Sequence, residues 1–282
     1  MPQIYADDIG IGKSIALYLR SSASSAAKND LVNYSLHLAD SSLIMGHRLS
    51  EWTAHGPMLE QDIAISNIAL DLIGQARNFY QYAAEIINSN GRNEKNITED
   101  DLAYLRDANE FKNLLITELP NGDWAQTIGK IFFFSVWQFY FYQKLIYSED
   151  KQLAAIAEKS LKEVTYHVRW SSEWVIRLGD GTEESKKRME KAVTALWPYT
   201  GEMFIPAAFE SNPENGVCIA GSGIKNDWSE KIKAVFHEAT LDITDEKSWM
   251  QSGGKNGIHT EHLGYILAEM QFLQRAYPGL EW

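Results

Sequence analysis

Histidine and carboxylate residues are the first candidates for chemistry, because a helical bundle can hold two iron ions on two Glu-x-x-His motifs. Each motif places a carboxylate and an imidazole on one inward helix face. No histidine of this 282-residue chain has a carboxylate three positions upstream. The seven histidines are His37, His47, His55, His167, His237, His259 and His262. The sequence therefore lacks the usual ligand motif of a di-iron centre.

Glu163 and His167 are the nearest approach to such a motif, one residue too far apart. Side chains at i and i+4 of a helix can touch, so this pair could serve as acid and base or as metal ligands. A structural hydrogen bond or ion pair on one helix face is the commoner role. Asp71 could join a degenerate metal site with Glu163 and His167, although Gly74 stands where its own histidine would be. Both interpretations stay open.

Two further groups could carry chemistry. His259 and His262 lie one turn apart, which suits either metal ligation or a helix start, with Thr260 and Glu261 favourable near the N-terminus. Cys218 is the single cysteine, which excludes a disulfide within the chain and any cysteine-based zinc or iron–sulfur site. We expect a small loop filler rather than a nucleophile, in the reducing cytoplasm.

The charge balance excludes several partners. Lys+Arg 26 against Asp+Glu 38 gives a net charge of −12, which argues against nucleic acid and against anionic membranes. The strongest apolar run, Ile131–Tyr142, is shorter than the roughly 20 residues of a membrane span. It predicts a helix that is buried on several sides. No phosphate-binding glycine motif or G-x-S-x-G sequence is present.

The elements that must position these residues are helices, because helical periodicity dominates the sequence. We expect one all-α domain over residues 31–282, a long-helix bundle, with residues 1–30 as an N-terminal extension that is partly ordered at best. Residues 206–223 are expected to be irregular. The predicted helices span residues 31–52, 59–87, 98–119, 124–147, 152–178, 184–199, 228–241 and 259–276.

Two helices show a polar stripe opposite their apolar side. The helix over residues 59–87 carries Asn67, Asp71, Gly74 and Asn78 on such a stripe. This stripe could face solvent, meet a partner, or form a polar seam inside the bundle. A glycine in mid-helix costs about 1 kcal/mol relative to alanine, so Gly74 suggests a close packing contact.

The helix over residues 152–178 places two tryptophans on its supposedly polar side. Glu163, His167, Trp170 and Trp174 follow one stripe there. Two tryptophans are too apolar for free solvent, so we expect this side to be covered by the chain itself or by a partner.

Long segments of the chain resemble the PaaC family of phenylacetate degradation. The resemblance covers about residues 31–282, and its segments are far more specific than any short motif. They are Leu49–Glu85 (LSEWTAHGPMLEQDIAISNIALDLIGQARNFYQYAAE), Leu119–Ile128 (LPNGDWAQTI), Lys159–Thr182 (KSLKEVTYHVRWSSEWVIRLGDGT) and Gly253–Trp282 (GGKNGIHTEHLGYILAEMQFLQRAYPGLEW).

The resemblance implies a ferritin-like helical fold and a role in a multicomponent monooxygenase. PaaC proteins pair with PaaA, the homologous subunit that carries the di-iron site. With further components, including a reductase, the complex converts phenylacetyl-CoA into its ring 1,2-epoxide using O₂ and NADPH. PaaC is the non-catalytic structural subunit, and no cofactor is expected on this chain. The missing Glu-x-x-His motif agrees with that role.

The resemblance assigns no catalytic role to any individual residue. The candidates for an interface with PaaA, or for a structural polar seam, come from the two stripes described above. They are Asn67, Asp71, Asn78, Glu163, His167, Trp170 and Trp174.

Overall fold

The computed structural model describes residues 26–89, 96–210, 216–242, 249–278 and 280. The predicted extension over residues 1–30 falls mainly on residues 1–25, which lie outside the described residues. The first helix, α2, is Ala26–Ser50 and begins five residues before the predicted domain start. The all-α prediction is confirmed, because the described residues form helices and turns with no strand among them.

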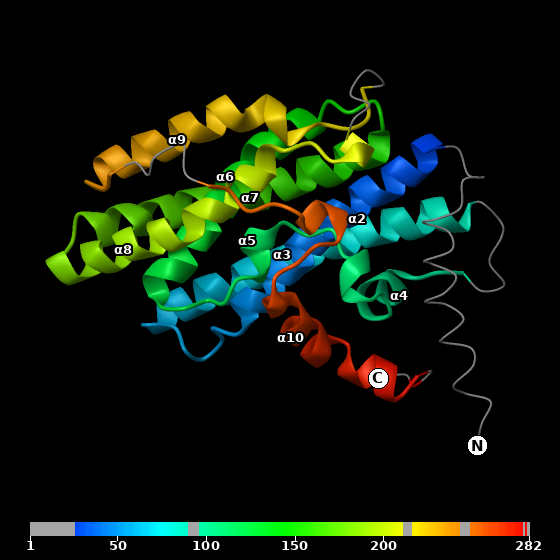
Figure 1. Ribbon diagram of the computed structural model, residues 1–282, viewed down its shortest axis with the longest axis horizontal. Coiled ribbons are helices and arrows are strands. Elements are labelled where there is room, and N and C mark those ends of the chain that lie inside the picture. The colour runs from blue at the N-terminus through cyan, green and yellow to red at the C-terminus, as the bar shows by residue number, and fades with distance from the viewer. Residues whose placement is uncertain (1–25, 90–95, 211–215, 243–248, 279, 281–282) are drawn as a thin grey trace.

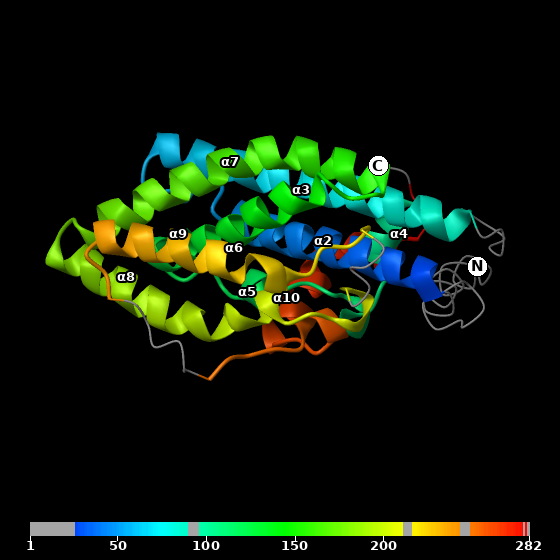
Figure 2. The ribbon, with the colours of Figure 1, turned by 90° about the horizontal axis from the view of Figure 1, so that it is seen from above.

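Four long helices form the bundle, whose arrangement Figure 1 shows. The helix α2 packs mainly against α3, Leu59–Asn88, as one antiparallel pair. The helices α6, Trp124–Leu145, and α7, Lys151–Gly179, form the second pair. The two pairs meet where α7 lies along α3, as Figure 2 shows from above. This arrangement is the ferritin-like long-helix bundle that the sequence predicts.

The helix α6 supplies the middle of the core. Its residues 127–138 are all buried. In the apolar run Ile131–Tyr142 all side chains are buried except the half-buried Phe139 and Tyr140, which confirms the prediction of a helix buried on several sides. Asp123 caps its start by accepting a hydrogen bond from the Gln126 backbone N–H. No helix in the described ranges is both long and apolar enough to cross a membrane.

The predicted helix over residues 98–119 is wrong beyond its first turns. Thr98 does cap α4, Glu99–Tyr104, through a capping box with Asp101. The chain then becomes irregular until the short α5, Leu115–Glu118. The reason is a tertiary contact, because side chains of α2 accept hydrogen bonds from backbone N–H groups of this segment. Asp40 accepts from the Lys112 backbone N–H at 2.8 Å, and Ser41 accepts from the Leu114 N–H at 3.1 Å.

The remaining helices surround the bundle. The helices α8, Glu183–Leu196, and α9, Lys225–Glu238, pack beside α6 and α7. In the predicted irregular segment, the described residues form two short 3₁₀ turns, Ala208–Glu210 and Gly221–Ile224, and are otherwise irregular. The final helices α10, Glu261–Met270, and α11, Phe272–Ala276, begin two residues later than predicted and extend away from the bundle (Figure 1).

Candidate functional site

A line of polar side chains runs through the centre of the bundle, where a ferritin-like protein would hold metal. We call it the central seam. It consists of Ser42 on α2, Gln75 on α3, Gln138 and Tyr142 on α6, and Glu163 on α7. Gln75 Nε2 donates to Glu163 Oε2 at 2.9 Å, and Gln138 Nε2 donates to Gln75 Oε1 at 3.3 Å. Gln138 Nε2 also lies 3.4 Å from Ser42 Oγ.

Burial shifts the pKa values of the titratable side chains in the central seam. Loss of solvent raises the pKa of Glu163, with a smaller rise from the Asp71 carboxylate, while the hydrogen bond from Gln75 opposes both. Burial also raises the pKa of the Tyr142 hydroxyl. The seam therefore favours neutral groups, and amides and hydroxyls satisfy one another inside it.

The seam residues do not fit a di-iron centre. Such a centre draws carboxylates from all four helices and histidines from two of them. Here three helices offer two amides and two hydroxyls, and Glu163 is the one carboxylate of the seam. Within the described ranges, no group of three or more His, Cys, Asp or Glu side chains could hold a metal ion.

The predicted pair of Glu163 and His167 is wrong, because each residue binds across to α3. His167 Nε2 lies 3.0 Å from Asp71 Oδ2, and the imidazole is fully buried. Glu163 instead accepts from Gln75. These two hydrogen bonds between neighbouring helices hold α7 against α3. Asp71, Glu163 and His167 do not form a group that could hold a metal ion.

The tryptophan stripe of α7 is covered by the chain itself. Trp170 and Trp174 both donate their indole N–H to Gln61 Oε1, at 3.1 and 2.8 Å. Trp124 packs edge-on against both rings, with centroids 6.1 and 5.4 Å away. On its other side Trp124 meets Trp52 in the same geometry. The sequence left open what covers this stripe, and the structure assigns the cover to α3 and α6.

The polar stripe of α3 is half-buried at two positions and exposed at the other two. Asp71 and Asn78 are half-buried, and Asp71 holds His167. Asn67 and Gly74 are exposed. The predicted close contact at Gly74 is wrong within the described chain, because a Cβ atom there would meet no atom within 4 Å.

A second buried network, which sequence reasoning missed, surrounds Asp40 on α2. Arg106 forms a fully buried ion pair with Asp40, and its Nη1 donates to Asp40 Oδ2 at 3.1 Å. The Tyr80 hydroxyl donates to Asp40 Oδ1 at 2.5 Å. Burial raises the pKa of Tyr80 well above its usual value, with Asp40 the next cause. These residues lie 26 to 66 positions apart, so no local spacing signals the network.

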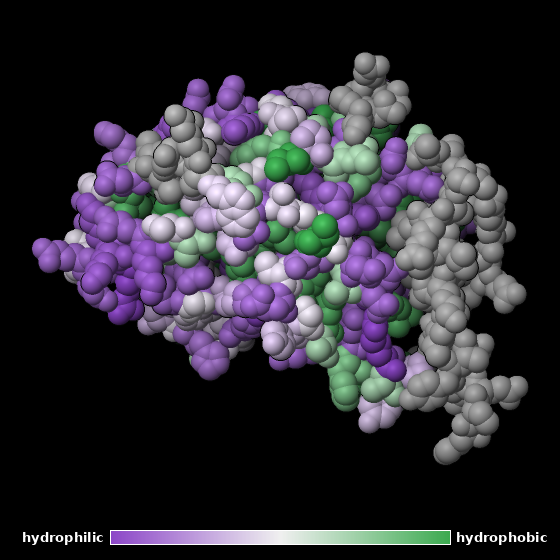
Figure 3. Space-filling view, viewed as in Figure 1, coloured by the Kyte–Doolittle hydropathy of each residue, from purple (hydrophilic) through white to green (hydrophobic). Residues whose placement is uncertain are grey.

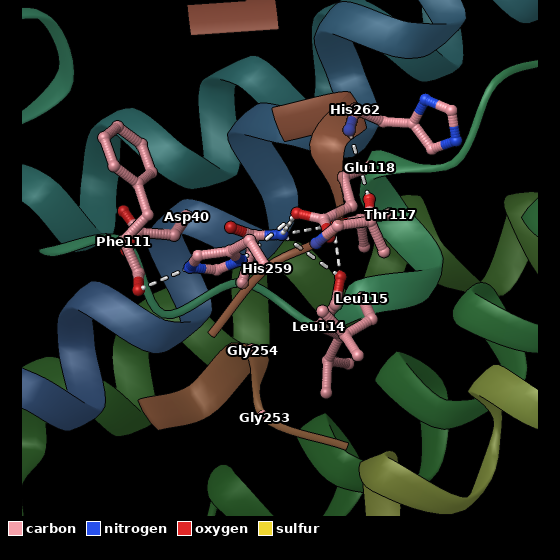
Figure 4. A network of polar contacts seen from close by, with 12 residues as sticks. Asp40, Phe111, Leu114, Leu115, Thr117, Glu118, Gly253, Gly254, His259 and His262 are labelled. Atoms are coloured by element: carbon pink, nitrogen blue, oxygen red, sulfur yellow. Dashed lines mark hydrogen bonds and ion pairs between the residues drawn. The ribbon is translucent and has the colours of Figure 1, made fainter. Parts of the chain in front are cut away.

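Buried carboxylates also hold the C-terminal segment in place (Figure 4). Glu118 accepts from the Thr260 backbone N–H at 2.7 Å and lies 3.1 Å from His259 Nδ1. His259 Nε2 lies 3.0 Å from the Phe111 carbonyl. Both ring nitrogens therefore face acceptor oxygens of the same chain. Both ring nitrogens of His259 are used in contacts with the chain itself, so they are not available as metal ligands. Thr260 caps α10, as the sequence suggested.

Glu202 completes this attachment. Its carboxylate accepts three backbone N–H groups, from Leu115 at 2.9 Å, Gly253 at 2.7 Å and Gly254 at 2.6 Å. Next to it, Lys255 Nζ lies 2.9 Å from Glu210 Oε2, and both side chains are almost fully buried. The paired glycines allow this contact, because a Cβ at Gly254 would lie 2.2 Å from the Asn113 carbonyl oxygen.

Three other buried groups have strongly perturbed protonation. Burial is the largest cause in each case. It raises the pKa of the Cys218 thiol to about 12, lowers that of Lys130 to about 7 and lowers that of His37 to about 3. A thiol with so high a pKa is a poor nucleophile, which supports the prediction of a filler at Cys218.

Comparison with known proteins places the chain in a family. The model of a family described as phenylacetic acid catabolic protein matches residues 19–282. A curated relative is one of the subunits of the 1,2-phenylacetyl-CoA epoxidase of Escherichia coli strain K12. It is 43% identical over 255 residues, which cover 90% of this chain and 100% of the relative.

Proposed function

The chain belongs to the phenylacetic acid catabolic protein family, and from this premise we propose that it is a non-catalytic structural subunit of a 1,2-phenylacetyl-CoA epoxidase. In this proposal it pairs with PaaA, the homologous catalytic subunit, and acts in the cytoplasm. The match to the full length of a relative that is itself an epoxidase subunit supports the assignment to such a complex.

The observation that carries the non-catalytic role is the composition of the central seam. Gln75 and Gln138 occupy the bundle centre as neutral amides that hydrogen-bond to each other. Amides do not supply the negative charge that two iron ions need, since carboxylates are the preferred oxygen ligands. The di-iron cofactor, O₂ activation and the NADPH-dependent reductase are accordingly assigned to the other components.

This chain's contribution is a rigid helical body. The Asp71–His167 and Gln75–Glu163 bonds lock α3 to α7, and Glu118 and Glu202 lock the C-terminal segment to α5. A body fixed in this way can hold a catalytic sister subunit in one orientation.

Co-expression with PaaA tests the proposal, with size and iron content measured for the separate chains and for their complex. We expect a stable complex in which iron follows PaaA, while the isolated chain holds well under one iron per molecule. As matched controls, Glu163→Gln and His167→Gln should leave the iron content of the complex unchanged. Stoichiometric iron on the isolated chain, lost in these two variants, would instead establish a degenerate metal site around Asp71, Glu163 and His167.

A further inference from the structure

The C-terminal arm, α10 and α11 together, has one face that the chain does not use. Its inner face carries Leu263, Ile266 and Leu267, which pack on Ile44 and Phe111 as a small separate core. Gln271 at the junction keeps a right-handed helical conformation, with φ −92° and ψ −5°. The outer residues of both helices therefore continue along one stripe.

The outer stripe combines large apolar, small and charged residues. Its members lie on one side of the helical repeat and are all exposed: Glu261, Gly264, Tyr265, Ala268, Phe272 and Arg275. Tyr265 is 68% exposed and Phe272 61% exposed. The hydrophobic surface of the arm is visible at the lower end of the molecule in Figure 3. Exposed aromatic residues gathered on a projecting element are typical of an interface.

A groove lies along the same stripe. It has a volume of about 480 Å³ and is lined by Gly264, Ala268 and Phe272, with Asp107 and Arg275 at its charged edge. A Cβ at Gly264 would meet no atom within 4 Å, so this position is a notch that the chain leaves open.

We propose that the arm binds the arm of a second copy of this chain, antiparallel, around a two-fold axis at Ala268. A two-fold interface uses the same patch on both copies, so it must be complementary to itself. In an antiparallel pair centred on position 268, residue 264 faces residue 272 of the second copy, and residue 261 faces residue 275.

In this register, large residues of one copy face small residues of the other, and acidic residues face basic ones. Phe272 of one copy meets the notch at Gly264 of the other, and the small side chain of Ala268 allows the helices to cross closely. Glu261 of one copy meets Arg275 of the other. Arg275 Nη2 lies 3.0 Å from Asp107 Oδ1 within its own chain. Nε and Nη2 also donate to backbone carbonyls of residues 104–106, so Nη1 is the group that would meet the second carboxylate. The two-fold axis repeats both matches.

The size of the interface predicts a weak affinity. The Tyr265 and Phe272 rings of two copies bury roughly 500 Å² together, given about 150–250 Å² for a fully buried aromatic side chain. Exposed Leu273 and Tyr277 lie on a different side of α11 and add no area to this contact. The total is therefore well below the roughly 1,200 Å² at the lower end of specific interfaces. We expect a weak dimer that forms toward the upper end of the micromolar range and dissociates on dilution.

Sedimentation velocity on the purified full chain between about 0.5 and 100 µM tests this association. We expect Gly264→Leu to weaken dimerisation at least tenfold, because the added side chain occupies the notch for Phe272 and its Cβ meets no atom of its own chain within 4 Å. Gly74→Leu on α3 is the matched control, since it also adds a side chain in open space and should leave dimerisation unchanged. Helix content and melting temperature identify any variant that fails to fold.

A cross-link tests the position of the axis. Cys218 is buried, so Ala268→Cys creates a single exposed thiol that mild oxidation should join to its copy. Glu190→Cys on the exposed side of α8 should stay monomeric under the same conditions. A chain that is monomeric at 100 µM, or a dimer that Gly264→Leu leaves intact, would overturn the proposal. Loss of PaaA binding in Gly264→Leu, with the chain alone always monomeric, would also overturn it and assign the arm to a different partner.

Discussion

At the residue scale, neutral glutamine side chains occupy the bundle centre, where a di-iron protein would have carboxylates. A carboxylate at position 75 or 138 would be buried with its negative charge, whereas the glutamine amides donate and accept in the same place. Glu163 remains as the one acid of the seam, and burial raises its pKa. The seam thus keeps a polar chain of hydrogen bonds that fixes the contact between helices without needing a cation.

Lys130 gives a pH dependence that stability measurements can detect. Its Nζ is fully buried and donates to the Leu119 carbonyl and to Asn121 Oδ1, both at 2.8 Å. Burial lowers its pKa to about 7, whereas an unfolded lysine titrates near 10.4. Between these values the unfolded chain binds the extra proton, so stability should rise with pH by about 1 kcal/mol per unit from pH 7.5 to 9.5.

Urea unfolding across this range measures the slope. In Lys130→Met the buried amine is gone, and the contribution of this residue to the slope should disappear. Lys151→Met, at an exposed lysine of α7, should keep the wild-type slope. Equal slopes in the wild type and in Lys130→Met would show that the amine does not titrate in this window.

At the element scale, neighbouring side chains decide where helices stop and how closely they approach. The segment after α4 has the composition of a helix, yet Asp40 and Ser41 take its backbone donors and hold it extended. The helices α2 and α3 approach each other closely at Gly46. A Cβ at Gly46 of α2 would lie 3.0 Å from Ile73 Cγ1 and 3.2 Å from the Ala69 carbonyl oxygen.

Two mid-helix glycines should therefore respond in opposite directions to the same substitution. Gly74→Ala should stabilise the fold by about 0.5–1 kcal/mol, because it gains helix propensity and meets no neighbour. Gly46→Ala should destabilise it by about 1–3 kcal/mol, because the added methyl forces α2 away from α3. Thermal and urea unfolding of both variants compare the signs. Stabilisation by both would mean that α2 and α3 separate at little cost.

At the scale of the whole molecule, buried ionic contacts join segments that the bundle alone would leave loose. Asp40 and Arg106 connect α2 to the loop after α4, and Glu118 and Glu202 connect α5 to the C-terminal segment. Each of these carboxylates accepts several hydrogen bonds from backbone or side-chain donors. The short helices and the arm therefore have fixed positions on the bundle.

Arg106→Met should reduce the stability of the whole domain by about 3–5 kcal/mol, because it leaves the Asp40 carboxylate buried without its cation. Urea unfolding measures the loss. The comparison variant is Arg177→Met, whose partner Glu173 lies 3.9 Å away on an exposed helix face. There we expect a change of about 1 kcal/mol at most, from this exposed pair and from the guanidinium over the Trp174 ring. Similar losses at both sites would contradict a special role for the buried pair.

The sequence by itself determined the helical class, the positions of the long helices and the absence of the Glu-x-x-His motif. These features depend on local periodicity and spacing, so they are readable along the chain. The resemblance of its long segments likewise indicated the family that the comparisons confirmed.

The tertiary structure alone decided which polar groups meet. Glu163 and His167 share a helix face, yet each finds a nearer partner on α3. The Asp40–Arg106 pair joins residues 66 positions apart, and no local pattern encodes such a contact. Pairing inside a core depends on how helix faces are oriented in three dimensions. Each buried polar group must then bond to whatever that packing brings within reach.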